Sequence, residues 1–211
     1  MKPRTLCRRT LLLAAGATLT ALATPAAAQT SDDMSIGSAT APLHLIEYAS
    51  LTCPHCAHFH AQNWATLKAN YIDTGRVRFT LHEMVTPPAP VALAMFQLAR
   101  CGEASADEYM RRVSILFERQ AAILGTGTMA GVLNALLATG AEWGLTAPQV
   151  TAALNDPAGV DRIERSIAAA SAAGVYQTPS FSFEDEFEQD PAFRTPEGMV
   201  RILDARLAQH R

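Results

Sequence analysis

The chain has 211 residues, of which 49% are hydrophobic and 18% are charged, so its composition is globular and excludes a disordered protein. Four cysteines in a chain of this length exclude a disulfide-rich scaffold. The formal charge is −3, but four basic residues lie within the first ten positions, and the remainder carries 13 basic and 20 acidic side chains. This balance excludes a basic surface for binding nucleic acid.

Residues 1–28 have the pattern of an export signal. A basic segment comes first, an apolar run covers residues 11–23, and a small-residue cleavage site ends at Ala28. The apolar run is too short for a membrane anchor. The pair Arg8-Arg9 leaves both the twin-arginine (Tat) and the general (Sec) export route open. We therefore expect a soluble mature protein in the periplasm, where thiols can be oxidised.

The mature chain opens with a β-α-β pattern. Leu43–Ala49 is short and rich in large apolar residues, as expected of a buried strand. Pro54 marks a helix start, and the apolar spacing after it predicts a helix that ends before Gly75. Residues Arg76–His82 alternate in polarity with a period of two, which predicts a second strand.

A block of helices follows, because residues 88 to 156 show only helical spacing broken by turn residues. Its four helices are expected at roughly 89–101, 105–120, 128–140 and 147–155. The rest of the chain predicts a helix, an antiparallel hairpin and a last helix, at about 158–173, 181–188 and 196–208. The fold class is therefore α/β, with a small mixed sheet interrupted by helices.

Cys53 and Cys56 enclose Pro54 and His55 directly after the first predicted strand. A cysteine at a helix N-terminus faces unpaired N–H groups and the positive end of the helix dipole, which stabilise a thiolate. Cys56 lies about one turn further on, close enough to form a disulfide. Pro54 suits the first helical position, and a protonated His55 adds positive charge beside the thiolate. All of these effects favour the reduced form, so the disulfide is expected to be oxidising.

Two other interpretations of this cysteine pair are open. A static disulfide would enclose only two residues and would add little loop-entropy stabilisation. A metal-binding carrier could use Cys53, Cys56 and His60, because His60 follows Cys56 by four residues on the same helix face. A haem attachment is excluded, since Ala57 stands where a histidine is required. The remaining cysteine, Cys101, ends an apolar helix and is expected to be a buried, inert thiol.

A second motif lies far along the chain, at Gly174–Phe181 (GVYQTPSF). Together with the strand, the Cys53-Pro54-His55-Cys56 turn and the intervening helices, it resembles the DsbA-like thiol–disulfide oxidoreductases of the thioredoxin superfamily. The resemblance covers essentially the whole mature chain. It implies a thioredoxin fold with an inserted helical domain: residues 29–87 and 157–211 would form the thioredoxin-like domain, and residues 88–156 the insertion.

The resemblance also implies roles for individual residues. Cys53 would be the exposed nucleophile and Cys56 its buried partner. Thr178 and Pro179 would lie across from Cys53, joined by a cis peptide bond, and the neighbouring backbone would pair with an extended substrate segment.

Glu47, on the first predicted strand, stands where that family carries a buried acid. The resemblance implies that Glu47 relays a proton for Cys56; a strand-end carboxylate in water is the alternative. Some members pair the acid with a lysine on the second strand, but Arg76–His82 contains no lysine. His82 or Arg78 could take that place, or Glu47 stands alone.

The implied activity is the introduction of disulfide bonds into reduced exported proteins, without a separate cofactor. A DsbB-like membrane quinone reductase would be the reoxidant, and the protein is expected to be a monomer that binds no nucleic acid. Isomerase and reductase relatives also carry a threonine before the cis-proline, as Thr178 does here. An isomerase or reductase of the same superfamily therefore remains an alternative.

Overall fold

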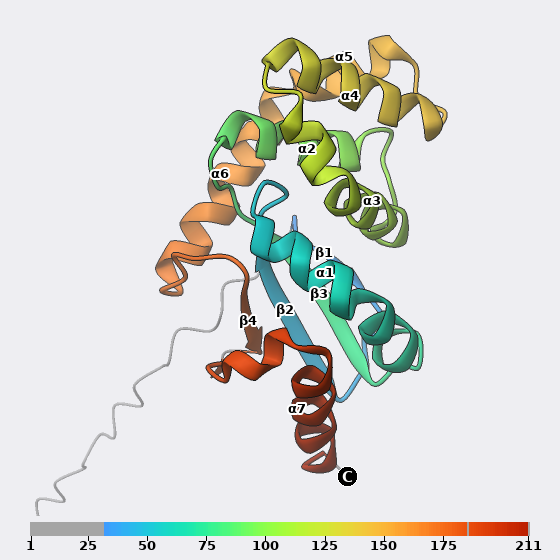
Figure 1. The fold of residues 1–211 in the computed structure, drawn as a ribbon. Coiled ribbons are helices and arrows are strands. Elements are labelled where there is room, and N and C mark those ends of the chain that lie inside the picture. The colour runs from blue at the N-terminus through green and yellow to red at the C-terminus, as the bar shows by residue number, and fades with distance from the viewer. Residues whose placement is uncertain (1–31, 185, 211) are drawn as a thin grey trace, which may run out of the picture.

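The computed structural model describes residues 32–184 and 186–210 (Figure 1). The predicted export signal at residues 1–28 lies outside these residues. Within the two described stretches, every helix is too short or too polar to span a bilayer.

The described residues form a five-stranded mixed sheet. Its strands are β1 (Met34–Ile36), β2 (Leu43–Ala49), β3 (Val77–Glu83), β4 (Ser180–Phe183) and β5 (Glu186–Phe187). They lie in the order β1-β3-β2-β4-β5. Strands β2 and β3 run parallel, and the other three neighbouring pairs are antiparallel. The parallel pair is joined through α1, so the predicted β-α-β unit is confirmed.

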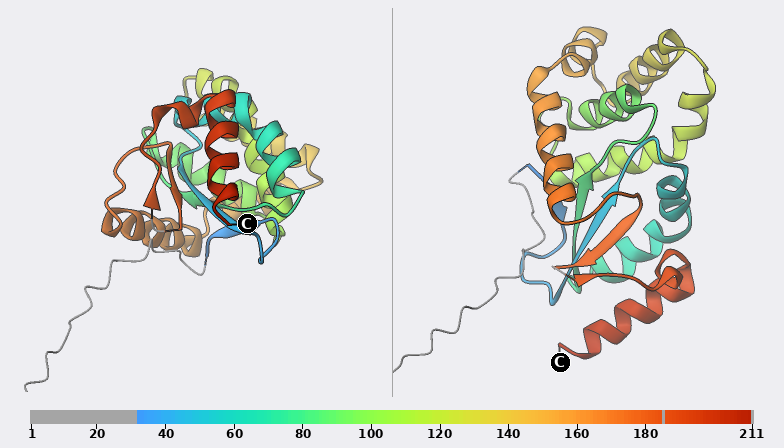
Figure 2. Two further views of the ribbon diagram at one scale, coloured as in Figure 1. Left: turned by 90° about the horizontal axis from the view of Figure 1, so that it is seen from below. Right: turned by 90° about the vertical axis from the view of Figure 1, so that its left-hand side faces the viewer.

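Helices lie on both faces and at one end of this sheet. In chain order they are α1 (Pro54–Leu67) with a π-helical turn η1 (Lys68–Ile72), α2 (Ala89–Arg100), α3 (Ala106–Gly125), α4 (Met129–Glu142), α5 (Ala147–Leu154), α6 (Pro157–Ala172), the 3₁₀ turn η2 (Pro191–Arg194) and α7 (Pro196–Ala208). The sheet is sandwiched between α6 on one side and α1 and α7 on the other (Figure 2). Helices α2 to α5 form the block inserted between β3 and α6 (Figure 1).

Strand β2 is buried along its whole length because both faces of the sheet are covered. Since successive side chains point to opposite faces, Leu45, Glu47 and Ala49 face α1, while Ile46 and Tyr48 face α6. The α1 side holds the larger apolar core, and a smaller cluster around Ile46 and Tyr48 fills the other side. Burial on both faces explains the nearly continuous apolar sequence of this strand.

A buried charge cluster ties the helical block to the sheet. Glu83, at the end of β3, is 1% exposed and accepts hydrogen bonds from Arg100 of α2 and Tyr109 of α3, both at 2.7 Å. Arg162 of α6 lies 3.6 Å from its second oxygen. A buried carboxylate is stable only when paired in this way, so Glu83 fixes three helices against one strand end.

Strand β1 was not predicted, because three residues are too few to show a period of two. The first predicted helix ends before Gly75, as expected, and its last turn is the π-helical turn that ends at Ile72. Helix α3 is longer than predicted and reaches Gly125. Its N-cap residue is Ser105, whose side chain accepts a hydrogen bond from the backbone N–H of Glu108. Such a cap stabilises the folded protein by about 1 kcal/mol.

Candidate active site

Cys53 is the N-cap residue of α1, and Cys56 lies one turn into the helix. Pro54 follows at the first helical position, where no hydrogen bond is lost. Both cysteines are free thiols in this structure. Helix α3 supports the turn from behind, because the Gln120 amide donates to the carbonyl oxygens of Leu51 and Cys53 at 2.9 and 3.0 Å. The sequence does not predict this role of Gln120, since nothing in it links Gln120 to a turn 67 residues away.

The accessibility of Cys53 differs from the expectation of an exposed nucleophile. Cys53 is 5% exposed and Cys56 is 0% exposed. Cys53 is the more accessible of the two, but the loop at Thr178 covers it: its thiol donates to the Thr178 carbonyl oxygen at 3.4 Å. The nucleophile therefore sits beneath that loop and not on an open surface.

The pKa of Cys53 is lowered to about 5. The main cause is a hydrogen bond from the Cys56 thiol, with smaller contributions from Thr178 and from the backbone N–H groups of Cys56 and His55; these outweigh burial, which acts in the opposite direction. A thiol at the N-terminus of a helix is expected to shift in this direction. At neutral pH Cys53 is therefore mostly a thiolate.

The pKa of Cys56 moves the other way and lies far above the range of an ordinary thiol. Burial is the main cause, followed by the hydrogen bond to Cys53 and the charge of Glu47. Two thiols one helical turn apart are thus pushed into different protonation states. Such a pair assigns the nucleophile to Cys53 and the proton-carrying partner to Cys56.

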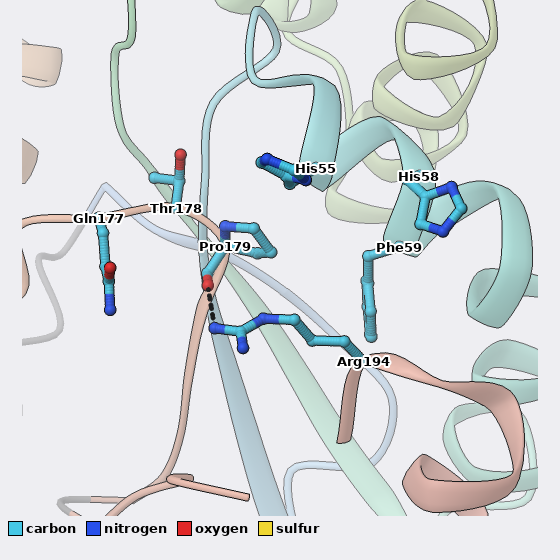
Figure 3. A pocket seen from close by; sticks show the side chains of 7 residues that line it. All are labelled: His55, His58, Phe59, Gln177, Thr178, Pro179 and Arg194. Carbon is cyan, nitrogen blue, oxygen red and sulfur yellow. Dashed lines mark hydrogen bonds between the residues drawn. The ribbon is translucent and has the colours of Figure 1, made fainter. Parts of the chain in front are cut away.

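The Thr178–Pro179 peptide bond is cis, as the resemblance implied, and this loop faces the start of α1. Between them lies a pocket of about 330 Å³. Its lining residues are His55, His58, Phe59, Gln177, Thr178, Pro179 and Arg194. In Figure 3 the guanidinium of Arg194 reaches across the pocket and donates to the Pro179 carbonyl oxygen at 3.2 Å. The lining of the pocket combines apolar walls with the Arg194 guanidinium and two imidazole rings, and it contains no carboxylate.

Glu47 is 0% exposed, so it is the buried acid that the resemblance implied and not a carboxylate in water. Its partner is His60 of α1, whose Nε2 lies 2.9 Å from Glu47 Oε2. The His60 ring packs against Phe117 and Trp64, with ring centroids 4.2 and 5.1 Å apart. His60 thus holds Glu47 under the cysteine turn.

The predicted partners of Glu47 on the second strand, His82 and Arg78, are wrong. The parallel register places Leu81 beside Glu47, so His82 and Arg78 point to the opposite face. There His82 bonds through Nδ1 to Asp33 at 3.0 Å and through Nε2 to the Ser166 carbonyl at 2.7 Å.

The alternative metal site is not formed. His60 does share a helix face with Cys56, but its Nε2 is directed at Glu47. Among the residues that the structure describes, no three His, Cys, Asp or Glu side chains are grouped to hold a metal ion. Cys101 lies away from the site and is buried at 7% exposure, as predicted.

The chain is similar to proteins of known sequence. A family model described as thioredoxin matches residues 29–205. The chain is 34% identical over 152 residues to the Na(+)/H(+) antiporter NhaA of Herminiimonas arsenicoxydans, covering 70% of this chain and 22% of that protein. It is 30% identical over 89 residues to a Rickettsia felis protein named "Putative protein-disulfide oxidoreductase", covering 42% of this chain and 31% of that protein. The matched regions thus span about a fifth to a third of these relatives.

Solved structures show the same fold. The crystal structure of Wolbachia pipientis α-DsbA1 superposes with a TM-score of 0.72 at 22% identity, covering 86% of this chain and 94% of that one. Oxidised BdbD from Bacillus subtilis gives a TM-score of 0.70 at 16% identity, covering 83% and 93%. The predicted thioredoxin fold with inserted helices is therefore confirmed. The chain belongs to the thioredoxin family and has the fold of its DsbA-like members.

Proposed function

We propose that this protein is a thiol–disulfide oxidoreductase of the periplasm that introduces disulfide bonds into exported proteins. The opposite pKa shifts of Cys53 and Cys56 within one helical turn carry the proposal. A stabilised Cys53 thiolate makes the reduced protein favourable and its disulfide a good oxidant. The lowered pKa also favours an oxidase over the alternative of an isomerase or reductase.

The oxidation proceeds in two exchanges. A substrate thiolate attacks Cys53 Sγ of the oxidised protein, the Cys53–Cys56 bond breaks, and its electron pair leaves on Cys56, which takes up a proton. A second substrate thiolate then attacks the substrate sulfur of the mixed disulfide. The substrate disulfide forms, and Cys53 leaves as the thiolate that its surroundings stabilise. The substrate has lost two electrons, and the protein has gained them.

The pocket beside Cys53 would hold the substrate segment that carries the attacking thiol. The backbone at Thr178 and Pro179 can pair with an extended peptide, because these two residues precede β4 and lie outside its pairing with β2 and β5. His55 and His58 line the opposite side of the pocket. A substrate would lie across this pocket with its sulfur at Cys53.

The proposal also covers the cofactor, the reoxidant, the export route and the partners of the protein. Thiol–disulfide exchange between these two cysteines needs no separate cofactor. An oxidant must restore the disulfide after each turnover, and a DsbB-like membrane quinone reductase would do so. The signal pattern at residues 1–28 supports export, by the Sec or the Tat route, and we propose a monomer with no nucleic-acid partner.

The proposal is tested with a reduced, unfolded secreted enzyme whose activity returns only when its disulfides form. The oxidised protein should restore that activity in stoichiometric amounts, while Cys53→Ser and Cys56→Ser proteins should not. Cys101→Ser is the matched control, because it removes a buried thiol outside the site and should leave the reaction unchanged. Equal activity of all three variants would contradict the proposal.

A further inference from the structure

The Glu47–His60 pair has two polar atoms without partners. Glu47 Oε2 and His60 Nε2 bond to each other at 2.9 Å. Glu47 Oε1 and His60 Nδ1, at the two ends of the pair, have no hydrogen-bond partner among the described residues, and both are buried. Buried polar atoms normally find partners, so an orphan atom at each end of one pair calls for an explanation.

Cys56 cannot exchange its proton with water directly. It is 0% exposed, and its pKa lies far above neutral pH. Every catalytic cycle nevertheless requires Cys56 to gain one proton and to lose one. Glu47 is close enough for its charge to act on Cys56, but Glu47 is itself 0% exposed. A proton that reaches Glu47 therefore needs a further group to leave the interior.

His60 is placed between Glu47 and the surface. It lines a hollow of about 460 Å³ between α1 and α3, which shares the lining residue His58 with the proposed substrate pocket. The other lining residues include Ala61, Trp64 and Phe117, with His58, Ser114 and Glu118 as polar groups. One end of the Glu47–His60 pair thus faces the cysteines, and the other borders a hollow that is large enough for water.

We propose that His60 takes the proton on from Glu47, the buried acid to which the resemblance assigns the relay for Cys56, and exchanges it with water in the hollow between α1 and α3. The proposal rests on the proposed function and deepens it. The proton enters at Glu47 Oε1, is carried across the Oε2–Nε2 hydrogen bond, and leaves at His60 Nδ1. His60 is a positioning residue, because it acts on the cysteine through Glu47.

The step that depends most on the relay is the re-formation of the Cys53–Cys56 disulfide. Cys53 is then joined to a partner sulfur in a mixed disulfide. The Cys56 thiol gives its proton to Glu47, and the Cys56 thiolate attacks Cys53 Sγ. The Cys53–Cys56 bond forms, the bond to the partner breaks, and its electron pair leaves on the partner thiolate. During substrate oxidation the same proton travels in the opposite direction.

This step can be isolated with Ellman's reagent, an aromatic disulfide that releases a coloured thiolate. Reduced Cys101→Ser protein that begins at residue 29, and so lacks Cys7, should release one coloured thiolate when Cys53 attacks the reagent. It should release a second when Cys56 attacks Cys53 Sγ and displaces the aryl thiolate that remained bound there. We expect His60→Gln to slow the second release about tenfold or more and to leave the first unchanged. Glutamine can still donate a hydrogen bond to Glu47 but cannot pass a proton on.

Coupling between the two residues gives a second readout. Glu47→Gln should slow the second release at least as much as His60→Gln, and the double variant should be no slower than Glu47→Gln alone. In the parent protein the rate of the second release should rise with pH and then reach a plateau, because the relay and not hydroxide takes the proton from Cys56. The titratable groups that face the pair are Cys56, and, in the hollow, Glu118 and His58. Without the relay the rate should rise with hydroxide and reach no plateau.

Two further variants separate a relay from a structural role. His210→Gln, at an exposed site near the end of the chain, should change neither release. His60→Ala should leave a space beside Glu47 that opens to the hollow. Imidazole added to this variant should occupy that space and restore the rate of the second release. Equal slowing of both releases by His60→Gln, or an unchanged second release, would overturn the relay. Absence of the second release from the parent protein would instead contradict the proposed function.

Discussion

Replacing Cys56 by alanine should raise the pKa of Cys53 well above its value in a Cys56→Ser protein. The hydrogen bond from residue 56 is the main cause of the lowered Cys53 pKa, and serine keeps an O–H donor where alanine has none. A hydrogen bond to a charged group is worth about 1.5–3 kcal/mol. At about 1.4 kcal/mol per pKa unit, the two variants should differ by roughly one to two units.

The assay is the rate of alkylation by iodoacetamide as a function of pH, since only the thiolate reacts. Both variants should begin at residue 29, which removes Cys7, and should carry Cys101→Ser, so that Cys53 is the single thiol. The alanine protein should still titrate below an ordinary thiol, because Thr178 and the backbone N–H groups remain. Equal midpoints in the two proteins would refute the reasoning, because the stabilisation of the thiolate would then come from Thr178 and the backbone N–H groups without residue 56.

Three further predictions concern stability and substrate binding. Because the folded-state pKa of Cys53 is depressed to about 5, the stabilisation that its thiolate gives the reduced protein is lost as the pH falls toward 5. Between pH 7 and pH 5 the free energy of unfolding in urea should fall by about 2 kcal/mol more for the reduced protein than for the oxidised protein. Equal falls for the two forms would contradict this prediction. Glu83→Gln should cost about 3–5 kcal/mol in the same assay, because it removes a buried carboxylate charge from the partly buried Arg100 and Arg162. Glu142→Gln, at an exposed ion pair, should cause no measurable change. Arg194→Ala should raise the KM for a peptide thiol several-fold and leave the reaction with glutathione unaltered; equal effects on both would exclude a peptide-binding role.

The sequence predicts the parts of the site that are local in the chain. The Cys53-Pro54-His55-Cys56 turn, its place at a helix start and the burial pattern of β2 all follow from short-range spacing. The resemblance added the cis peptide bond before Pro179, which no periodicity reveals.

The partner of Glu47 could not be predicted in this way, because it depends on the register between strands. A shift of one residue decides whether His82 faces Glu47 or the other side of the sheet, and the sequence does not show that register. The spacing of His60 from Cys56 indicates a shared helix face and a candidate metal ligand. The interpretation as a metal ligand is wrong, because His60 Nε2 is hydrogen-bonded to Glu47. Arg194, which comes from a turn 15 residues beyond Pro179, enters the pocket only through the tertiary fold.

The central claim is that the Cys53–Cys56 disulfide is a donor of oxidising equivalents, and its redox equilibrium with glutathione tests that claim most directly. A Cys53 pKa of about 5 lies between the values typical of strongly oxidising and reducing members of such proteins, about 3.5 and 7. We therefore predict a two-electron potential between about −120 and −200 mV. A value near −270 mV would mean a reductase and would contradict the proposed direction. Failure of Cys53 and Cys56 to cycle would contradict the activity itself.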